Sequence, residues 1–210
     1  MATSRANVYR VLARCYAREI DEAFAHDVTR AFSLESEDEA LARELSAMCG
    51  ALDGADAAAL EQLAVTFDRV FFGMGPLGAK HAFPYESVYT SARGLMMQDA
   101  YAEVVQELRA NGFAKDEAFT EPEDHLAVEL SFMAELATRS LDAIESGSDE
   151  DVVADITAQL EFLRAHLLSW TARFCADLEA ACEGFYAHLA RFTRRFLELD
   201  ERILAELSAL

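Results

Sequence analysis

The feature that most constrains the fold is the scarcity of residues that interrupt helices. The chain has three prolines, and they fall in two short regions. Elsewhere apolar residues recur at helical spacing, and no alternating pattern typical of β-strands has useful length. We therefore predict an all-α, single-domain helical bundle over residues 1–210, with a possible subdivision near 112–121. The N-terminal stripe shows the pattern: Val8, Val11, Leu12, Cys15 and Tyr16.

Apolar stripes and interrupting residues together predict where the helices begin and end. After the N-terminal helix, we expect helices over about 22–32 and 37–51, a helix ending at Gly73, and one over 87–111. The next helix is expected to open at Thr120, because Thr120 and Glu123 have the spacing of a capping box. Pro122 is tolerated in a first helical turn. The expected break at 146–149 precedes an apolar stripe over 156–174, and a last helix follows Gly184.

The net charge and hydrophobic content of the chain restrict the classes of molecule that it can bind. The net charge is −20 with 52% hydrophobic residues, so the chain is too apolar to be disordered throughout. A polyanionic surface repels nucleic acid and anionic lipid, and it attracts basic peptides. We expect no nucleic-acid partner, although such a surface can also serve only solubility.

The cysteines and the N-terminus indicate a reducing compartment. None of the four cysteines forms a CxxC pair, and Cys175 and Cys182 would lie about two helical turns apart, too far for a disulfide. No apolar core of a signal peptide and no run of about 18 apolar residues is present. We therefore expect a cytoplasmic protein without stable membrane insertion.

A nucleotide site is a weak alternative. Residues 73–80 nearly match a phosphate-binding loop, but Ala79 separates the second glycine from Lys80, and His81 stands where Ser or Thr is required. The segment also follows a predicted helix, whereas the motif follows a strand. We interpret it as a glycine-rich connection between helices.

A metal site is also weakly supported. Glu121, His125 and Glu129 are spaced by four and would share a helical face, but Glu-x-x-His and HExxH motifs are absent. The plainer interpretation of His125 is a partly exposed histidine in the first helical turn, bonded to a carboxylate. No GxSxG motif or activated cysteine indicates catalysis. We expect no metal, no cofactor and no enzyme activity.

A peptide-binding groove is better supported. The segment 73–89 combines glycines with nearby aromatic residues, and the helix start at 121–125 is acidic. Aromatic rings provide contact area for a peptide, and carboxylates bind arginine. Two alternatives remain: the aromatic residues could fill the core beneath a long loop, and the acids could serve the helix dipole.

The same segments resemble a known family. Phe71-Phe72-Gly73 with Pro76 resembles its LF-x-GP element, and residues 83–89 (FPYESVY) resemble its P-x-E-S-V-Y/W element. Residues 121–133 (EPEDHLAVELSFM) resemble its E-P-D-D-H-x-x-x-E-L-x-x-M signature, and His166-Leu167-x-x-Trp170 and Phe185-Tyr186 match later elements. The family is the TorD/DmsD/NarJ-like group of redox-enzyme maturation chaperones, and the likeness runs from about Val8 to Leu199. The additional Gly75 departs from the pattern.

The resemblance implies an all-α chaperone that binds the leader of a molybdopterin oxidoreductase catalytic subunit, often a twin-arginine signal, until the cofactor is inserted. It also implies a monomer or a homodimer, in some members with exchanged helices. The alternative is a helical adaptor in anaerobic respiratory enzyme assembly that does not read leaders. We expect the apolar part of the leader on Phe71, Phe72, Tyr85 and Tyr89, and its arginines on Asp124, Glu121 and Glu86. The full set of candidate leader-binding residues is Phe71, Phe72, Gly73, Pro76, Pro84, Tyr85, Glu86, Ser87, Tyr89, Glu121, Pro122, Asp124 and His125.

Overall fold

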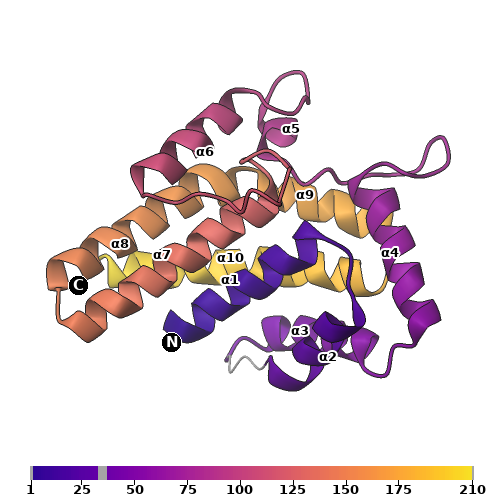
Figure 1. Ribbon diagram of the computed structural model, residues 1–210, viewed down its shortest axis with the longest axis horizontal. Coiled ribbons are helices and arrows are strands. Elements are labelled where there is room, and N and C mark those ends of the chain that lie inside the picture. Colours follow the sequence, from indigo (N-terminus) through magenta and orange to yellow (C-terminus); the bar gives the residue numbers. More distant parts are fainter. Residues whose placement is uncertain (1, 33–36, 210) are drawn as a thin grey trace. The chain divides into compact units, whose positions relative to one another are not determined.

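The computed structural model describes residues 2–32 and 37–209; Met1, residues 33–36 and Leu210 lie outside the described part. The predicted all-α class is confirmed: the described residues form helices and contain no strand, only an isolated bridge between Tyr85 and His125 (Figure 1). The elements are α1 (Ala2–Ala17), α2 (Glu22–Ala31), α3 (Glu39–Leu52), α4 (Ala57–Phe71), α5 (Glu86–Thr90), α6 (Asp99–Ala110), α7 (Leu126–Ser146), α8 (Asp149–Phe162), the π-helical segment η1 (Leu163–Leu167), α9 (Leu168–Ala181) and α10 (Phe185–Leu207).

The chain forms two compact units, and α9 and α10 each run from one into the other. Unit 1 comprises Met1–Ala17, Tyr85–Thr171 and Leu197–Leu210, and unit 2 comprises Arg18–Pro84 and Ala172–Phe196. No boundary between the units falls within 112–121, where the sequence placed a possible subdivision.

Unit 1 is built around α7. Helix α1 packs along α7, and α8 returns antiparallel against its other side (Figure 1). Twelve residues of α7 are buried, so this helix is apolar over most of its circumference and lies in the middle of the unit. The largest apolar side chains of this core include Tyr9, Leu12, Phe132, Met133, Leu136, Phe162 and Leu163.

A buried polar network ties the ends of the chain together in unit 1. Asp200 of α10 accepts hydrogen bonds from Arg5 and, at 2.6 Å, from Tyr9, both on α1. Arg5 also donates to Gln159 of α8 at 2.9 Å. Because Arg5 and Asp200 are both buried, each depends on the other for compensation of its charge.

Unit 2 contains α2, α3, α4 and the adjoining parts of α9 and α10. Its helices α2, α3 and α4 each begin at an aspartate whose carboxylate accepts a backbone N–H of the first turn: Asp21, Asp38 and Asp56. Aromatic side chains meet in its core, where Phe71 lies edge-to-face on Phe67 and on Tyr186. The expected end of α4 is confirmed, since Gly73 adopts the left-handed conformation (φ +70°) directly after it.

Two helix predictions were wrong. The helix expected over 87–111 is two helices, because residues 91–98 form an irregular connection in which Gly94 and Met97 have positive φ. The backbone N–H of Gln98 there is bonded to the hydroxyl of Ser87 instead of a helical carbonyl. The helix expected to open at Thr120 begins at Leu126 instead, with His125 as its N-cap. Thr120 and Glu123 therefore form no capping box.

No sequence pattern indicated the π-helical turn η1, which joins α8 to α9. The expected break after α7 is confirmed, since Gly147 ends this helix in the left-handed conformation. The four cysteines, all of which are described, are free thiols. Within the described ranges, no helix combines the length and apolar character needed to cross a membrane.

Candidate functional site

The centre of the candidate site is the junction between α5 and the segment that leads into α7. Tyr85 and His125 form an antiparallel bridge, and the backbone N–H of Glu86 donates to the carbonyl of Asp124 at 2.9 Å. The next N–H, of Ser87, donates to Oδ2 of Asp124 at 3.0 Å. Asp124 therefore caps the first turn of α5 from a distant part of the chain, which also suits the helix dipole. The two sequence motifs meet in space within unit 1.

Asp124 pays a desolvation penalty for this position. Its side chain is fully buried, and Oδ1 has no hydrogen-bond partner. Burial raises the pKa of Asp124, while the hydrogen bonds from Ser87 act in the opposite direction. The expectation that Asp124 meets an arginine of the leader does not fit this burial. Its carboxylate holds α5 instead.

His125 is a neutral capping residue. Its Nδ1 accepts the backbone N–H of Ala127 at 3.0 Å, so the ring proton sits on Nε2. Burial lowers the pKa of His125 to about 3. The ring also lies edge-to-face between Tyr85 and Phe119. The interpretation of His125 as a partly exposed histidine of a first turn was wrong, because the helix begins after it and the aromatic rings enclose it.

Tyr85 and Glu121 form a second link between the two segments. The Tyr85 hydroxyl donates to Oε2 of Glu121 at 2.6 Å, and burial together with this bond raises the pKa of Tyr85. Lys115 bonds the backbone carbonyl of Glu121 and lies 3.7 Å from Oε1 of Glu123. Glu121 and Tyr85 are therefore engaged with each other, and Tyr85 is buried rather than presented to a guest peptide.

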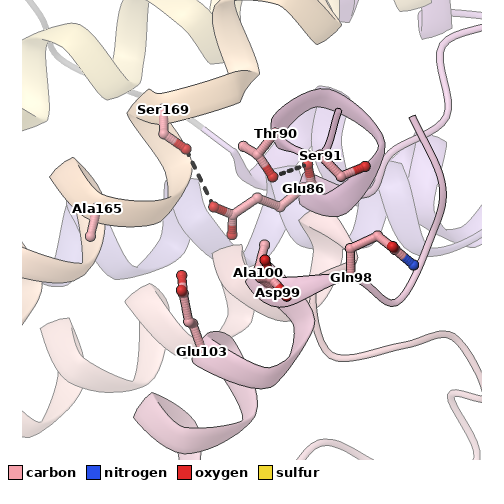
Figure 2. Close-up of a pocket in the computed structure, with 9 residues that line it drawn as sticks. All are labelled: Glu86, Thr90, Ser91, Gln98, Asp99, Ala100, Glu103, Ala165 and Ser169. Atoms are coloured by element: carbon pink, nitrogen blue, oxygen red, sulfur yellow. Dashed lines mark hydrogen bonds between the residues drawn. The ribbon is translucent and has the colours of Figure 1, made fainter. Parts of the chain in front are cut away.

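Glu86 connects α5 to the start of α9. Its Oε2 accepts from Nδ1 of His166 at 2.9 Å. Its Oε1 accepts from the hydroxyl of Ser169 at 3.3 Å, a bond drawn in Figure 2. Residue Glu86 is only 3% exposed. A buried carboxylate bonded to a histidine and a hydroxyl is held in one orientation, so the direction of Glu86 is set by the π-helical segment and α9.

Glu129 completes a group of buried acids with Glu86 and Asp124, which we name the carboxyl cluster. Glu129 is fully buried, and its Oε2 accepts from Nε1 of Trp170 at 3.2 Å. Burial, and next the negative charges of Glu86 and Asp124, raise the pKa of Glu129 well above its usual range. The protonated carboxyl can then donate a hydrogen bond to Glu86. The Tyr89 ring stacks on the Trp170 ring, with 5.5 Å between the ring centroids.

Sequence reasoning did not place Glu129, His166, Ser169 or Trp170 in the site. A signal existed for two of them, since His166 and Trp170 are four residues apart and share a helical face. Glu129 was considered only as a metal ligand on a helix with Glu121 and His125. That arrangement was wrong, because Glu121 and His125 precede α7. Across the described residues, no group of three or more ligand side chains is placed to hold a metal ion.

Pro122 lies in unit 1, where its carbonyl accepts the backbone N–H of His125 at 3.1 Å. The remaining predicted residues lie in unit 2, at the end of α4 and on the connection from α4 to Pro84. Phe71 is buried in the core, whereas Phe72 is half exposed. The connection also exposes Met74, Leu77 and Phe83, and we name Phe72, Met74, Leu77 and Phe83 the apolar loop. Between residue 72 and Pro84 no helix forms, so the near match to a phosphate-binding loop lacks the helix that the motif requires. The glycine-rich connection predicted from the sequence is what the structure contains.

Comparison with known proteins gives consistent matches. Residues 34–176 match the family model described as nitrate reductase delta subunit. A chaperone protein TorD from Vibrio cholerae serotype O1 (strain ATCC 39541) is 31% identical over 191 residues, which covers 84% of this chain and 81% of that protein. A chaperone protein TorD from Shewanella sp. (strain ANA-3) is 33% identical over 183 residues, which covers 82% of this chain and 78% of that protein.

A solved structure has the same fold. It is described as a putative redox enzyme maturation protein from Archaeoglobus fulgidus and superimposes with a TM-score of 0.56. The match covers 92% of this chain and 93% of that one at 20% sequence identity. The relatives are named chaperones, in agreement with the expectation that this chain is not an enzyme.

Proposed function

Because this chain belongs to the nitrate reductase delta subunit family and is a TorD-like chaperone of redox-enzyme maturation, we propose that it binds the N-terminal leader of a molybdopterin oxidoreductase catalytic subunit. It holds that leader, of the twin-arginine type, in the cytoplasm until the cofactor has been inserted. Export or assembly follows release.

The observation that carries this proposal is the apolar loop. Leu77 is fully exposed, Met74 is 73% exposed, and Phe72 and Phe83 add exposed aromatic surface on the same connection. Exposed apolar side chains grouped on one connection are costly in water and mark interaction surfaces. The central part of a leader is apolar, so it gains free energy by covering them.

Charge supports the same partner. The chain carries a net charge of −20, and a leader begins with basic residues. Opposite charge speeds the encounter and makes its rate depend on salt. Ordering a flexible peptide costs roughly 2–5 kcal/mol of the gross interaction energy, which keeps binding reversible.

In this proposal the motif residues of unit 1 have a supporting role. Asp124, His125 and Tyr85 are buried and hold α5 against the start of α7. Substituting them would weaken leader binding indirectly, by releasing α5 and with it Glu86. This replaces the direct contacts expected from the sequence for Asp124, Tyr85 and the buried Phe71.

The test is calorimetry of the full chain with a synthetic twin-arginine leader. The double variant Met74→Ser/Leu77→Ser should bind roughly tenfold more weakly, because two exposed side chains lose their apolar contact with the peptide. Val153→Ser is the control, since Val153 is also an exposed apolar residue but lies on α8. Equal affinity of the double variant and the control would remove the apolar loop from the site.

A pull-down with the client enzyme separates leader binding from the adaptor alternative. Deleting the leader from the client should abolish capture by the chaperone. Undiminished capture would instead support an adaptor that recognises the folded body of the client.

A further inference from the structure

The connection that carries the apolar loop is bonded at both of its ends to the last turn of α4. The carbonyls of a last helical turn need partners from outside the helix. The carbonyl of Asp68 accepts the backbone N–H of Met74 at 3.1 Å, and the carbonyl of Val70 accepts the N–H of Ala82 at 3.0 Å. The connection therefore leaves α4 and returns to the same turn, so its backbone is ordered although its apolar side chains are exposed.

Arg69, which lies between these two carbonyls, contacts both the connection and α9. Its backbone carbonyl accepts a hydrogen bond from Nδ1 of His81 at 3.0 Å. Its guanidinium group donates from Nη1 to the carbonyl of Ala181 at 3.0 Å. Ala181 is the last residue of α9, so a cation there also suits the negative end of the helix dipole. Arg69 thereby joins the ends of α4 and α9 within unit 2.

The aliphatic stem of Arg69 lies against Gly75. A Cβ atom placed on Gly75 would lie 2.9 Å from Cγ of Arg69 and 3.4 Å from Cβ of Ala79. Because Cγ is close to the backbone, the stem can move away only if the guanidinium group leaves Ala181. The φ angle of Gly75 is not in the left-handed region, so close approach is what requires a glycine here. This is a physical reason for the additional glycine found in the sequence.

The other end of the connection depends on His81. The His81 ring lies tilted on the Phe83 ring, with 5.5 Å between the ring centroids. The Phe83 ring in turn covers Gly73, where a Cβ atom would lie 3.5 Å from Cζ of Phe83. Contacts of Arg69 therefore reach both ends of the apolar loop, through Gly75 next to Met74 and through His81 next to Phe83.

We propose that Arg69 is a positioning residue for leader binding, which holds the apolar loop in its binding conformation before a peptide arrives. This inference rests on the proposed function. A surface that is already ordered loses little conformational entropy on binding, so more of its contact energy appears as affinity. Removing the Arg69 side chain leaves the four apolar side chains in place but allows the connection many conformations.

The first measurement is calorimetry of the full chain with a synthetic twin-arginine leader. Arg69→Ala and Gly75→Ala should each weaken binding about tenfold, because the connection must then be ordered during binding. Arg69→Lys keeps the stem and a donor for a single carbonyl, so its affinity should stay within about twofold of the wild type. Arg43→Ala and Gly50→Ala are the controls, since both residues are exposed on α3 and a Cβ atom on Gly50 meets nothing within 4 Å.

The double variant Arg69→Ala/Gly75→Ala tests whether the two residues act through each other. Without Cγ of Arg69, the new methyl group at position 75 meets no arginine. The second substitution should therefore weaken binding by no more than about twofold beyond Arg69→Ala alone. Losses that multiply to about a hundredfold would show that the two residues act independently, and would overturn the inference.

The second measurement is amide hydrogen exchange of the free chain, which does not depend on leader binding. The N–H groups of Met74 and Ala82 should exchange about tenfold faster in Arg69→Ala and Gly75→Ala, while amides of α3 keep their wild-type rates. This local effect distinguishes release of the connection from a general loss of stability. Unchanged exchange at Met74 and Ala82, or unchanged leader affinity in both variants, would overturn the inference. A wild-type chain that fails to bind the leader would instead reject the proposed function, and faster local exchange would still show that Arg69 holds the connection.

Discussion

The carboxylate of Asp124 accepts the backbone N–H of Ser87 at 3.0 Å, across 37 residues of sequence. This bond joins the two motifs that the sequence analysis singled out, and it explains why an aspartate stands between Glu123 and His125. Helix α5 has no side-chain cap of its own, so its first N–H groups depend on Asp124. The short helix is thereby held with Glu86 directed at His166 and Ser169.

Removing that cap should destabilise the fold. Asp124→Ala leaves the N–H of Ser87 buried and unpaired, which costs about 1–3 kcal/mol in the free energy of unfolding. Asp124→Asn should cost less, because an amide oxygen can still accept and the negative charge of the cluster falls. Urea denaturation of both variants measures the difference. Equal losses in the two would contradict the capping role.

Glu129 should make stability fall as pH rises. Its pKa is raised by burial, so above the usual glutamate pKa of about 4.3 the folded chain keeps a proton that the unfolded chain releases. The free energy of unfolding therefore decreases with pH up to the folded pKa, by at most about 1.4 kcal/mol per pH unit. Glu129→Gln removes this loss. In urea titrations, the free energy of unfolding of the variant should therefore rise relative to that of the wild type as the pH goes from 5 to 7.

Glu135→Gln provides the control for that experiment. Glu135 is exposed on the same helix, and its substitution by Gln makes the same chemical change as Glu129→Gln. It should follow the pH dependence of the wild type. A Glu129→Gln variant that also runs parallel to the wild type would show that Glu129 is charged in the folded chain.

His125 should contribute a pH dependence of the opposite sign. Its folded pKa is lowered to about 3, against about 6.5 in an unfolded chain. The stabilisation is complete above pH 6.5 and is lost as pH falls toward 3, by at most about 1.4 kcal/mol per pH unit. His125→Asn keeps a capping side chain without this titration, so it should lose less stability than the wild type between pH 7 and 5.

The alanine variant separates capping from titration. His125→Ala should lose about 1 kcal/mol at pH 7, because the N–H of Ala127 loses its acceptor. If His125→Asn kept the full pH dependence of the wild type, the titrating group would have to be another residue.

The buried ion pair of Arg5 and Asp200 should contribute far more to the free energy of unfolding than the more exposed ion pair of Arg164 and Glu201. Asp200→Ala leaves Arg5 buried without a carboxylate and should cost about 3–5 kcal/mol. Glu201→Ala removes the ion pair with Arg164, which is largely exposed, and should cost less than about 1 kcal/mol. Thermal or urea unfolding of the Asp200→Ala and Glu201→Ala variants measures the two losses of stability. Similar losses would mean that the Arg5–Asp200 pair contributes little.

The sequence by itself determined the helical class, several helix ends and the two motif segments. These follow from local physics: apolar spacing fixes which face of a helix is buried, and glycine permits the left-handed ends after α4 and α7. The motifs were also correctly expected to lie together, at least for the part from Tyr85 to Tyr89 and the part from Glu121 to His125.

Tertiary structure decided what those residues do. A sequence shows that Asp124 and His125 are polar, but only packing shows that both are buried and used as caps, so that neither is free to contact a peptide. The start of α7 at Leu126 depends on a bridge to Tyr85, a partner far along the chain. The carboxyl cluster likewise combines side chains that lie far apart in the sequence, and no local pattern encodes such a meeting because burial and distance are properties of the folded chain.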